Sequence, residues 1–142
     1  MFLGEYKHNL DAKNRLIIPS KFRDQLKDEF IITKGNDKCL NIYTMEQWQV
    51  IYNDLEKLVM AKKINRQYKH SFTSKAVECK CDSLGRIQLP PNLVALINIQ
   101  KECVIVGEGN YASIWAKEEY EIFDAEIYEN YESISETVVV DE

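Results

Sequence analysis

An internal repeat is the feature that most constrains how this 142-residue chain can fold. Aligning the sequence with itself at an offset of 71 places DAKNRLIIP, residues 11–19, on DSLGRIQLP, residues 82–90. The match continues through the apolar positions of a following segment and, after one inserted residue, places 31–35 on 103–107. Self-similarity of this kind predicts one supersecondary unit used twice.

Each copy has the same predicted order of elements. A short strand leads into a turn, Lys13-Asn14 in the first copy and Leu84-Gly85 in the second, and a second strand follows. Asn and Gly tolerate the positive φ that tight hairpin turns need, so we expect a hairpin at each of these turns. Proline then opens a short helix, a second hairpin follows, and an amphipathic helix closes the copy. These second hairpins are expected at 30–33 with 39–43 and at 103–106 with 111–115. The predicted class is a β-rich α+β fold with a pseudo-twofold internal repeat.

The copies divide the chain into four predicted parts: a first module at 5–47, a helix and basic linker at 48–75, a second module at 76–119, and an acidic C-terminal helix and tail at 120–142. The regular structure of each copy covers only about 45 residues, near the limit for a self-sufficient core. The two copies are therefore expected to pack on each other and on further chains, as a homo-oligomer.

Charge is distributed unevenly along the chain. The net charge is −5, but residues 117–142 hold Lys117 against ten carboxylates, so the remaining 116 residues carry a net positive charge. The longest stretch without acidic residues, 57–77, contains six Lys and Arg residues. Local charge governs the encounter with a polyanion, so the acidic total does not exclude nucleic acid. Whether 57–77 touches DNA or is a solvated linker is left open, with the linker slightly favoured.

Several classes of function are not expected. Cys79 and Cys81 form the closest cysteine pair, and C-x-C is not the C-x-x-C spacing of zinc ribbons. No nucleophile with a base and no paired acids stand out, so we expect no enzyme, cofactor or small-molecule substrate. Gly107-Glu108-Gly109 lacks the third glycine of a nucleotide loop. The chain shows no signal peptide and no membrane-spanning run, which makes the cytoplasm the expected compartment.

The motif that repeats with its charges intact is D-x-x-x-R across the turn, formed by Asp11 with Arg15 and by Asp82 with Arg86. In a structural reading, the aspartate accepts backbone hydrogen bonds in the turn and pairs with the arginine. In a functional reading, the aspartate orients an arginine exposed at a hairpin tip, where a two-stranded ribbon fits the DNA major groove and Arg can bind guanine through two hydrogen bonds. The two readings are compatible.

At these residues the chain resembles the MraZ family of bacterial transcriptional regulators. The opening MFLGEY, the run 10–15 and the segment 21–23 look like the first signature of that family, and 82–87 with Leu89-Pro90 looks like the second. The resemblance covers nearly the whole chain. It implies two tandem AbrB-like swapped-hairpin β-barrel modules, ring-like homo-oligomers and association with the nucleoid.

The resemblance also implies binding of double-stranded DNA at short repeats upstream of the division and cell-wall gene cluster that includes the regulator's own gene, in the role of a repressor. The DNA-contact turns of the family map to Lys13, Asn14 and Arg15 in the first copy and to Leu84, Gly85 and Arg86 in the second. Asn14 stands where the family usually has Gly. Leu84 stands opposite Lys13, so the second turn is expected to carry one charge fewer.

Three alternatives stay open on the sequence alone. An antitoxin-like interaction module would use the acidic C-terminal helix to cap a protein partner, and removing 117–142 would abolish that contact while sparing DNA binding. A barrel enzyme would need perturbed residues lining a pocket, and a purely structural ring would show no sequence-dependent DNA affinity.

Overall fold

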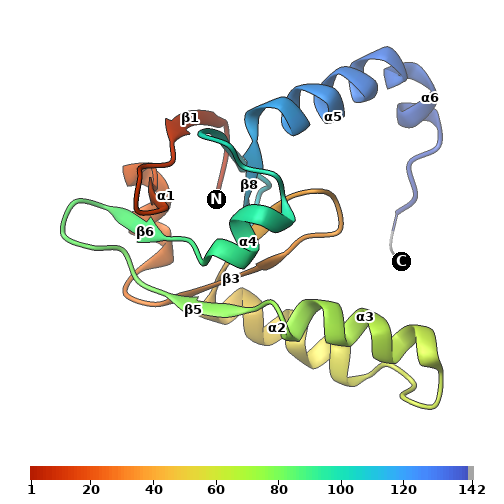
Figure 1. Ribbon diagram of the computed structural model, residues 1–142. Helices are drawn as coiled ribbons and strands as arrows, with labels where there is room; N and C mark the ends of the chain where they lie inside the picture. Colours follow the sequence, from red (N-terminus) through yellow and green to blue (C-terminus); the bar gives the residue numbers. More distant parts are fainter. Residues whose placement is uncertain (141–142) are drawn as a thin grey trace.

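The computed structural model describes residues 1–140, which form one β-rich body with helices at its edges (Figure 1). In chain order the elements are β1 (Glu5–Asn9), β2 (Arg15–Ile17), α1 (Ser20–Leu26), β3 (Phe30–Lys34), β4 (Leu40–Thr44), α2 (Met45–Glu56), α3 (Lys63–Thr73), β5 (Val77–Cys79), β6 (Arg86–Gln88), α4 (Pro91–Leu96), β7 (Glu102–Gly107), β8 (Ala112–Ala116), α5 (Lys117–Glu129) and α6 (Tyr131–Glu136). The β-rich α+β class predicted from the sequence is confirmed. The two second hairpins are present as β3 with β4 and β7 with β8.

The main sheet is antiparallel and is built from both copies of the repeat. Its strand order is β1-β7-β8-β4-β3-β5. The two copies meet at the centre, where β4 pairs with β8, and this pairing relates β3 to β7 and β5 to β1 by a pseudo-twofold axis. Each copy places its first strand against the hairpin of the other, since β1 pairs with β7 and β5 pairs with β3. The two copies are therefore interleaved rather than side by side.

A second, two-stranded sheet joins the copies again. β2 and β6 pair antiparallel, with Leu16 opposite Ile87. This pairing corrects the hairpin expected at each D-x-x-x-R turn, because the strands before and after the turn belong to different sheets. The physical reason is burial: pairing β2 with β6 places Leu16 and Ile87 together in the core, where both are almost fully inaccessible to solvent.

One hydrophobic core spans the two copies. The apolar helix positions that the repeat matches are buried, so that Phe22 and Leu26 of α1 lie in the same cluster as Leu93 of α4 and Ile97 at its C-terminal end. The aromatic ring of Phe2 meets Phe22 edge-on at a centroid distance of 5.1 Å. Because one cluster holds side chains from both repeats, the stability of each copy depends on the other.

The segment 48–75 lies beside the sheet as a pair of helices, α2 and α3 (Figure 1). Thr44 caps α2 by accepting a hydrogen bond from the backbone N–H of Gln47 at 3.1 Å, as its capping-box sequence predicts. Helix α3 occupies most of the stretch expected as a basic linker. Its Phe72 packs with Leu55 of α2, and the Phe72 carbonyl accepts a 2.6 Å hydrogen bond from buried Thr33.

Helices α5 and α6 project from the opposite side of the body (Figure 1). Only the first turns of α5 join the fold, where Tyr120 and Phe123 pack around Trp115. Beyond them Tyr128, Tyr131 and Ile134 are exposed. The last two residues of the acidic tail, 141–142, lie outside the described residues. Within the described part, no helix combines the length and the apolar character needed to cross a bilayer.

Candidate functional site

The first D-x-x-x-R turn is a closed network around one carboxylate. Asp11 Oδ1 accepts hydrogen bonds from the backbone N–H groups of Lys13 at 2.9 Å and Arg15 at 2.8 Å. Its Oδ2 accepts a 2.7 Å hydrogen bond from Arg15 Nε. Asn14 adopts a positive φ of 58°, which confirms the expected turn geometry. The aspartate therefore fixes both the turn backbone and the direction of the arginine.

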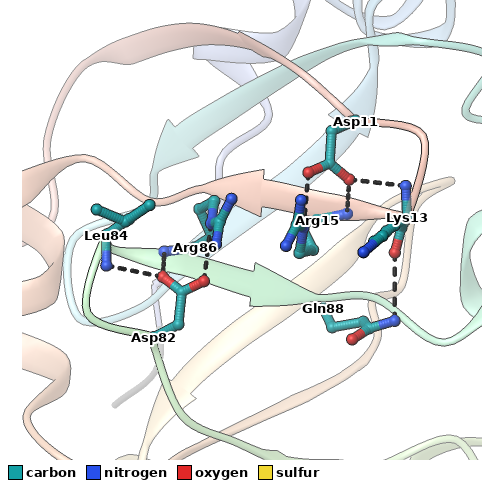
Figure 2. A network of polar contacts seen from close by, with 7 residues as sticks. All are labelled: Asp11, Lys13, Arg15, Asp82, Leu84, Arg86 and Gln88. Carbon is teal, nitrogen blue, oxygen red and sulfur yellow. Dashed lines mark hydrogen bonds and ion pairs between the residues drawn. The ribbon is translucent and has the colours of Figure 1, made fainter.

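The second turn repeats this network atom for atom. Asp82 Oδ1 accepts from the backbone N–H groups of Leu84 at 3.0 Å and Arg86 at 2.8 Å, and Oδ2 accepts from Arg86 Nε at 2.7 Å. Gly85 has a φ of 77° at the position equivalent to Asn14. Figure 2 shows the two pairs at opposite ends of the ribbon formed by β2 and β6. Two diverged sequences thus build the same local structure.

Each turn is also bonded to the chain just beyond the ribbon strand of the other copy. The backbone N–H of Leu89 donates to the Asn14 carbonyl at 2.8 Å, and the backbone N–H of Ile18 donates to the Gly85 carbonyl at 2.9 Å. Each turn is held by the strand end of the other copy. The spacing between the two arginines is consequently a property of the ribbon rather than of either loop.

One face of the ribbon points to solvent and carries both arginines. In the register, Arg15 lies opposite Gln88 and Ile17 lies opposite Arg86, so these four side chains share the outer ribbon face. Leu16 and Ile87 pair with each other, point to the inner face of the ribbon and are buried. Gln88 also donates to the Lys13 carbonyl at 3.2 Å, a bond visible in Figure 2. The outer ribbon face is therefore a small platform with an oriented arginine at each end.

Both arginines are held but still accessible. Their side chains are 29% exposed at Arg15 and 25% exposed at Arg86. Each guanidinium uses Nε for its aspartate, and within residues 1–140 its terminal nitrogens donate no hydrogen bond to protein. The two Nη groups of an arginine can form two parallel hydrogen bonds with an external acceptor. The geometry therefore leaves the terminal nitrogens of each guanidinium available to an external acceptor.

The aspartates are negatively charged at neutral pH. Backbone hydrogen bonds from Arg15 and Lys13, together with the Arg15 side chain, hold the pKa of Asp11 below its usual value of 3.8. Arg86 and Leu84 lower the pKa of Asp82 in the same way. A charged carboxylate accepts hydrogen bonds only, so it keeps each arginine in one orientation.

The sequence predicted both turns and both pairs, but it missed Arg23. This residue of α1 lies over Gly85 in the second turn. The repeat hides it, since the equivalent position in the second copy is Val94, an apolar residue packed against the core. The one signal in the sequence is that Arg23 directly follows Phe22. The burial of Phe22 orients α1 toward the core and thereby brings Arg23 to the second turn.

The cysteines do not form a second site. Cys39 and Cys103 are buried, Cys79 and Cys81 are half-buried, and all four are free thiols. Burial raises the pKa of Cys39 and of Cys103 to about 12, which keeps both thiols protonated. Among the described residues no group of three or more His, Cys, Asp or Glu side chains is placed to hold a metal ion.

Comparison with known proteins gives the family. The family profile described as "MraZ protein, putative antitoxin-like" matches the chain twice, over residues 1–70 and 72–141, once for each copy of the repeat. The "Transcriptional regulator MraZ" of Ligilactobacillus salivarius (strain UCC118) is 45% identical over 139 residues, covering 98% of this chain and 97% of the relative. The chain belongs to the MraZ family, and the resemblance seen in the sequence is confirmed. This is a family of transcriptional regulators and not of enzymes.

Proposed function

We propose that the protein regulates transcription by binding double-stranded DNA in a sequence-specific manner through the outer ribbon face. The observation that carries the proposal is the pair of equal, aspartate-held arginines at the two ends of one ribbon. A two-stranded ribbon fits the major groove, which is about 12 Å wide, and an arginine with free Nη groups matches guanine O6 and N7. A ribbon with an oriented arginine at each end can read two nearby positions of the same groove.

The six turn residues take different parts in this proposal. Lys13 is exposed and attracts a backbone phosphate, while Arg15 and Arg86 read base edges. Asn14 and Gly85 set the turn conformation. Leu84 is 66% exposed, and an apolar side chain there can contact a thymine methyl group. Asp11 and Asp82 anchor the turns.

Two arginine-tipped turns per chain are too few for tight binding alone. We therefore propose that the protein acts as a ring-like homo-oligomer on several short repeated boxes, because linking subunits raises the effective concentration of each further contact. The boxes lie upstream of the division and cell-wall gene cluster, which includes the regulator's own gene, and their occupation represses transcription. A cytoplasmic, nucleoid-associated location follows from this role.

Each copy is proposed to be an AbrB-like swapped-hairpin β-barrel module, arranged in tandem with the other. The exchange of β1 and β5 between the copies supports this assignment. The module boundaries stay those expected from the sequence, 5–47 and 76–119, with 48–75 as the connecting segment and 120–142 as the acidic extension. The interleaving means that the two modules form one folding unit.

Fluorescence anisotropy with DNA from upstream of the protein's own gene tests the proposal. Wild type, Arg15→Ala and Arg86→Ala are compared at two salt concentrations, and Lys38→Gln on the β3–β4 hairpin serves as a charge control. The expected result is tight, salt-sensitive and sequence-selective binding that collapses in both arginine variants and survives in the control. Equal binding by the arginine variants, with unchanged oligomer size, would assign the motif a structural role only.

A second candidate is an antitoxin-like interaction module. The exposed Tyr128, Tyr131 and Ile134, set among acidic side chains on α5 and α6, favour it. Since Tyr120 and Phe123 belong to the core, the truncation suited to this test removes residues 130–142 and not 117–142. A protein partner that co-purifies with the full chain, and is lost with this truncation, would support the interaction module.

A further inference from the structure

The guanidinium of Arg23 lies directly over the backbone of the second turn. A Cβ atom placed on Gly85 would overlap the Nη1 and Cζ atoms of Arg23 and would approach its Cδ to 3.0 Å. Glycine adopts the φ of 77° at this turn without strain, and it also leaves free the space that Arg23 occupies. In the repeat, Asn14 stands at the position of Gly85, and Val94 stands at the position of Arg23.

Arg23 has no partner that explains its position. Within residues 1–140 its side chain makes no hydrogen bond to protein and no ion pair, although it is half-buried. No buried side-chain nitrogen in this part of the chain lacks a hydrogen-bond partner, so solvent must reach the Arg23 nitrogens. Arg23 also lies close enough to Cys81 for its charge to oppose the rise in the pKa of that thiol, which burial raises above its usual value. The positive charge is thus held beside residues 81–85 without being neutralised.

We propose that Arg23 is a phosphate-binding residue of the DNA-binding face and supplies to the second turn the charge that Lys13 supplies to the first. The inference rests on the proposed function. Leu84 replaces Lys13 in the repeat, which leaves Arg86 as the only cation that the second D-x-x-x-R turn itself contributes. With Arg23 above Gly85, each turn has two cations, Lys13 with Arg15 and Arg23 with Arg86. An unpaired guanidinium that touches turn backbone is suited to a phosphate oxygen, since such contacts position the protein while base contacts specify the site.

The salt dependence of binding isolates this role. Each neutralised phosphate contributes about −0.9 to the slope of log K against log salt. Arg23→Gln should therefore make the slope less negative by about 0.9 for each subunit engaged with the DNA, on specific and on shuffled sequence alike. Arg23→Lys keeps the charge and should keep the slope, and Lys38→Gln should leave it unchanged. Thermal unfolding and light scattering establish that each variant keeps its fold and oligomer size.

A substitution at Gly85 tests the geometry without touching the charge. Asn tolerates the positive φ, as Asn14 does in the first turn, but its Cβ must displace the Arg23 guanidinium. Gly85→Asn should therefore reduce the slope as Arg23→Gln does, and the double variant should show no further reduction. The matched control is Gly109→Asn on the β7–β8 hairpin, where φ is 89° and no atom lies within 4 Å of the place of a Cβ, and it should leave the slope unaltered.

The outcomes separate this inference from the proposed function. If Arg15→Ala and Arg86→Ala lose binding while Arg23→Gln retains the full slope, the inference is overturned and the proposed function stands. An equal loss of slope in Arg23→Gln and Arg23→Lys would also overturn it, since it would indicate a packing role. If the wild-type protein shows no salt-dependent DNA binding, both fail together.

Discussion

Replacing Leu16 by alanine tests whether the ribbon couples the two copies of the repeat. Leu16 is fully buried and lies opposite Ile87 of the other copy, and both belong to the core cluster shared by the two copies. Truncation of a buried leucine to alanine costs about 2–5 kcal/mol, and Ile87→Val costs about 0.5–1.5 kcal/mol. Because the two side chains fill the same space, the cavity left at Leu16 reduces what Ile87→Val can still lose.

The double variant should therefore lose less free energy of unfolding than the two single variants lose together, and the difference should be about 0.5 kcal/mol or more. Urea unfolding at one fixed protein concentration measures the four free energies of unfolding, since oligomerisation makes stability depend on concentration. Ile17→Ala on the same strand is the matched control. Its side chain faces solvent at 43% exposure, and its loss should be smaller than either core loss. Additive losses for Leu16→Ala and Ile87→Val would refute the claim that the copies share one core through the ribbon.

Three further predictions follow from single contacts. Asp82→Asn places an amide N–H group against Arg86 Nε, so DNA affinity should fall in the anisotropy assay. In the wild-type protein, the hydrogen bond between Asp82 and Arg86 should be lost only below pH 3.8, because the pKa of the Asp82 carboxyl group is lowered from that value. Cys39 and Cys103, with pKa values of about 12, should react with iodoacetamide at pH 8 only after denaturation. Thr33→Val removes the hydrogen bond that joins β3 to α3 and should lower the free energy of unfolding by about 1 kcal/mol in urea.

The repeat predicted much of the fold because it marks equivalent buried positions. Residue pairs such as Leu26 and Ile97 are apolar in both copies and lie in one core. Which strand pairs with which was harder to infer. Strand β1 alternates in the same way whether it pairs with β2 or with β7, and the local pattern of side chains does not distinguish the two partners. The interleaving is a long-range property set by the burial of the whole sheet.

The candidate site likewise combines residues that sequence spacing indicates with a residue that only the fold brings close. The pairs of Asp11 with Arg15 and Asp82 with Arg86 are local, so sequence spacing alone indicated them. Arg23 reaches the second turn from another element, and its position there depends on how α1 packs beside the ribbon. The expectation that the second turn carries one cation fewer holds for the turn residues themselves, but it ignores this neighbour.

The most direct test of the central claim is the ratio of affinities for upstream DNA and shuffled DNA in the double variant with Arg15→Lys and Arg86→Lys. Lysine keeps each positive charge but cannot form two parallel hydrogen bonds with guanine. The ratio should fall by at least about tenfold, since each such contact discriminates by about 1–3 kcal/mol, while affinity for shuffled DNA should stay close to the wild-type value. An unchanged ratio would contradict the claim that aspartate-held arginines on the ribbon read the DNA sequence.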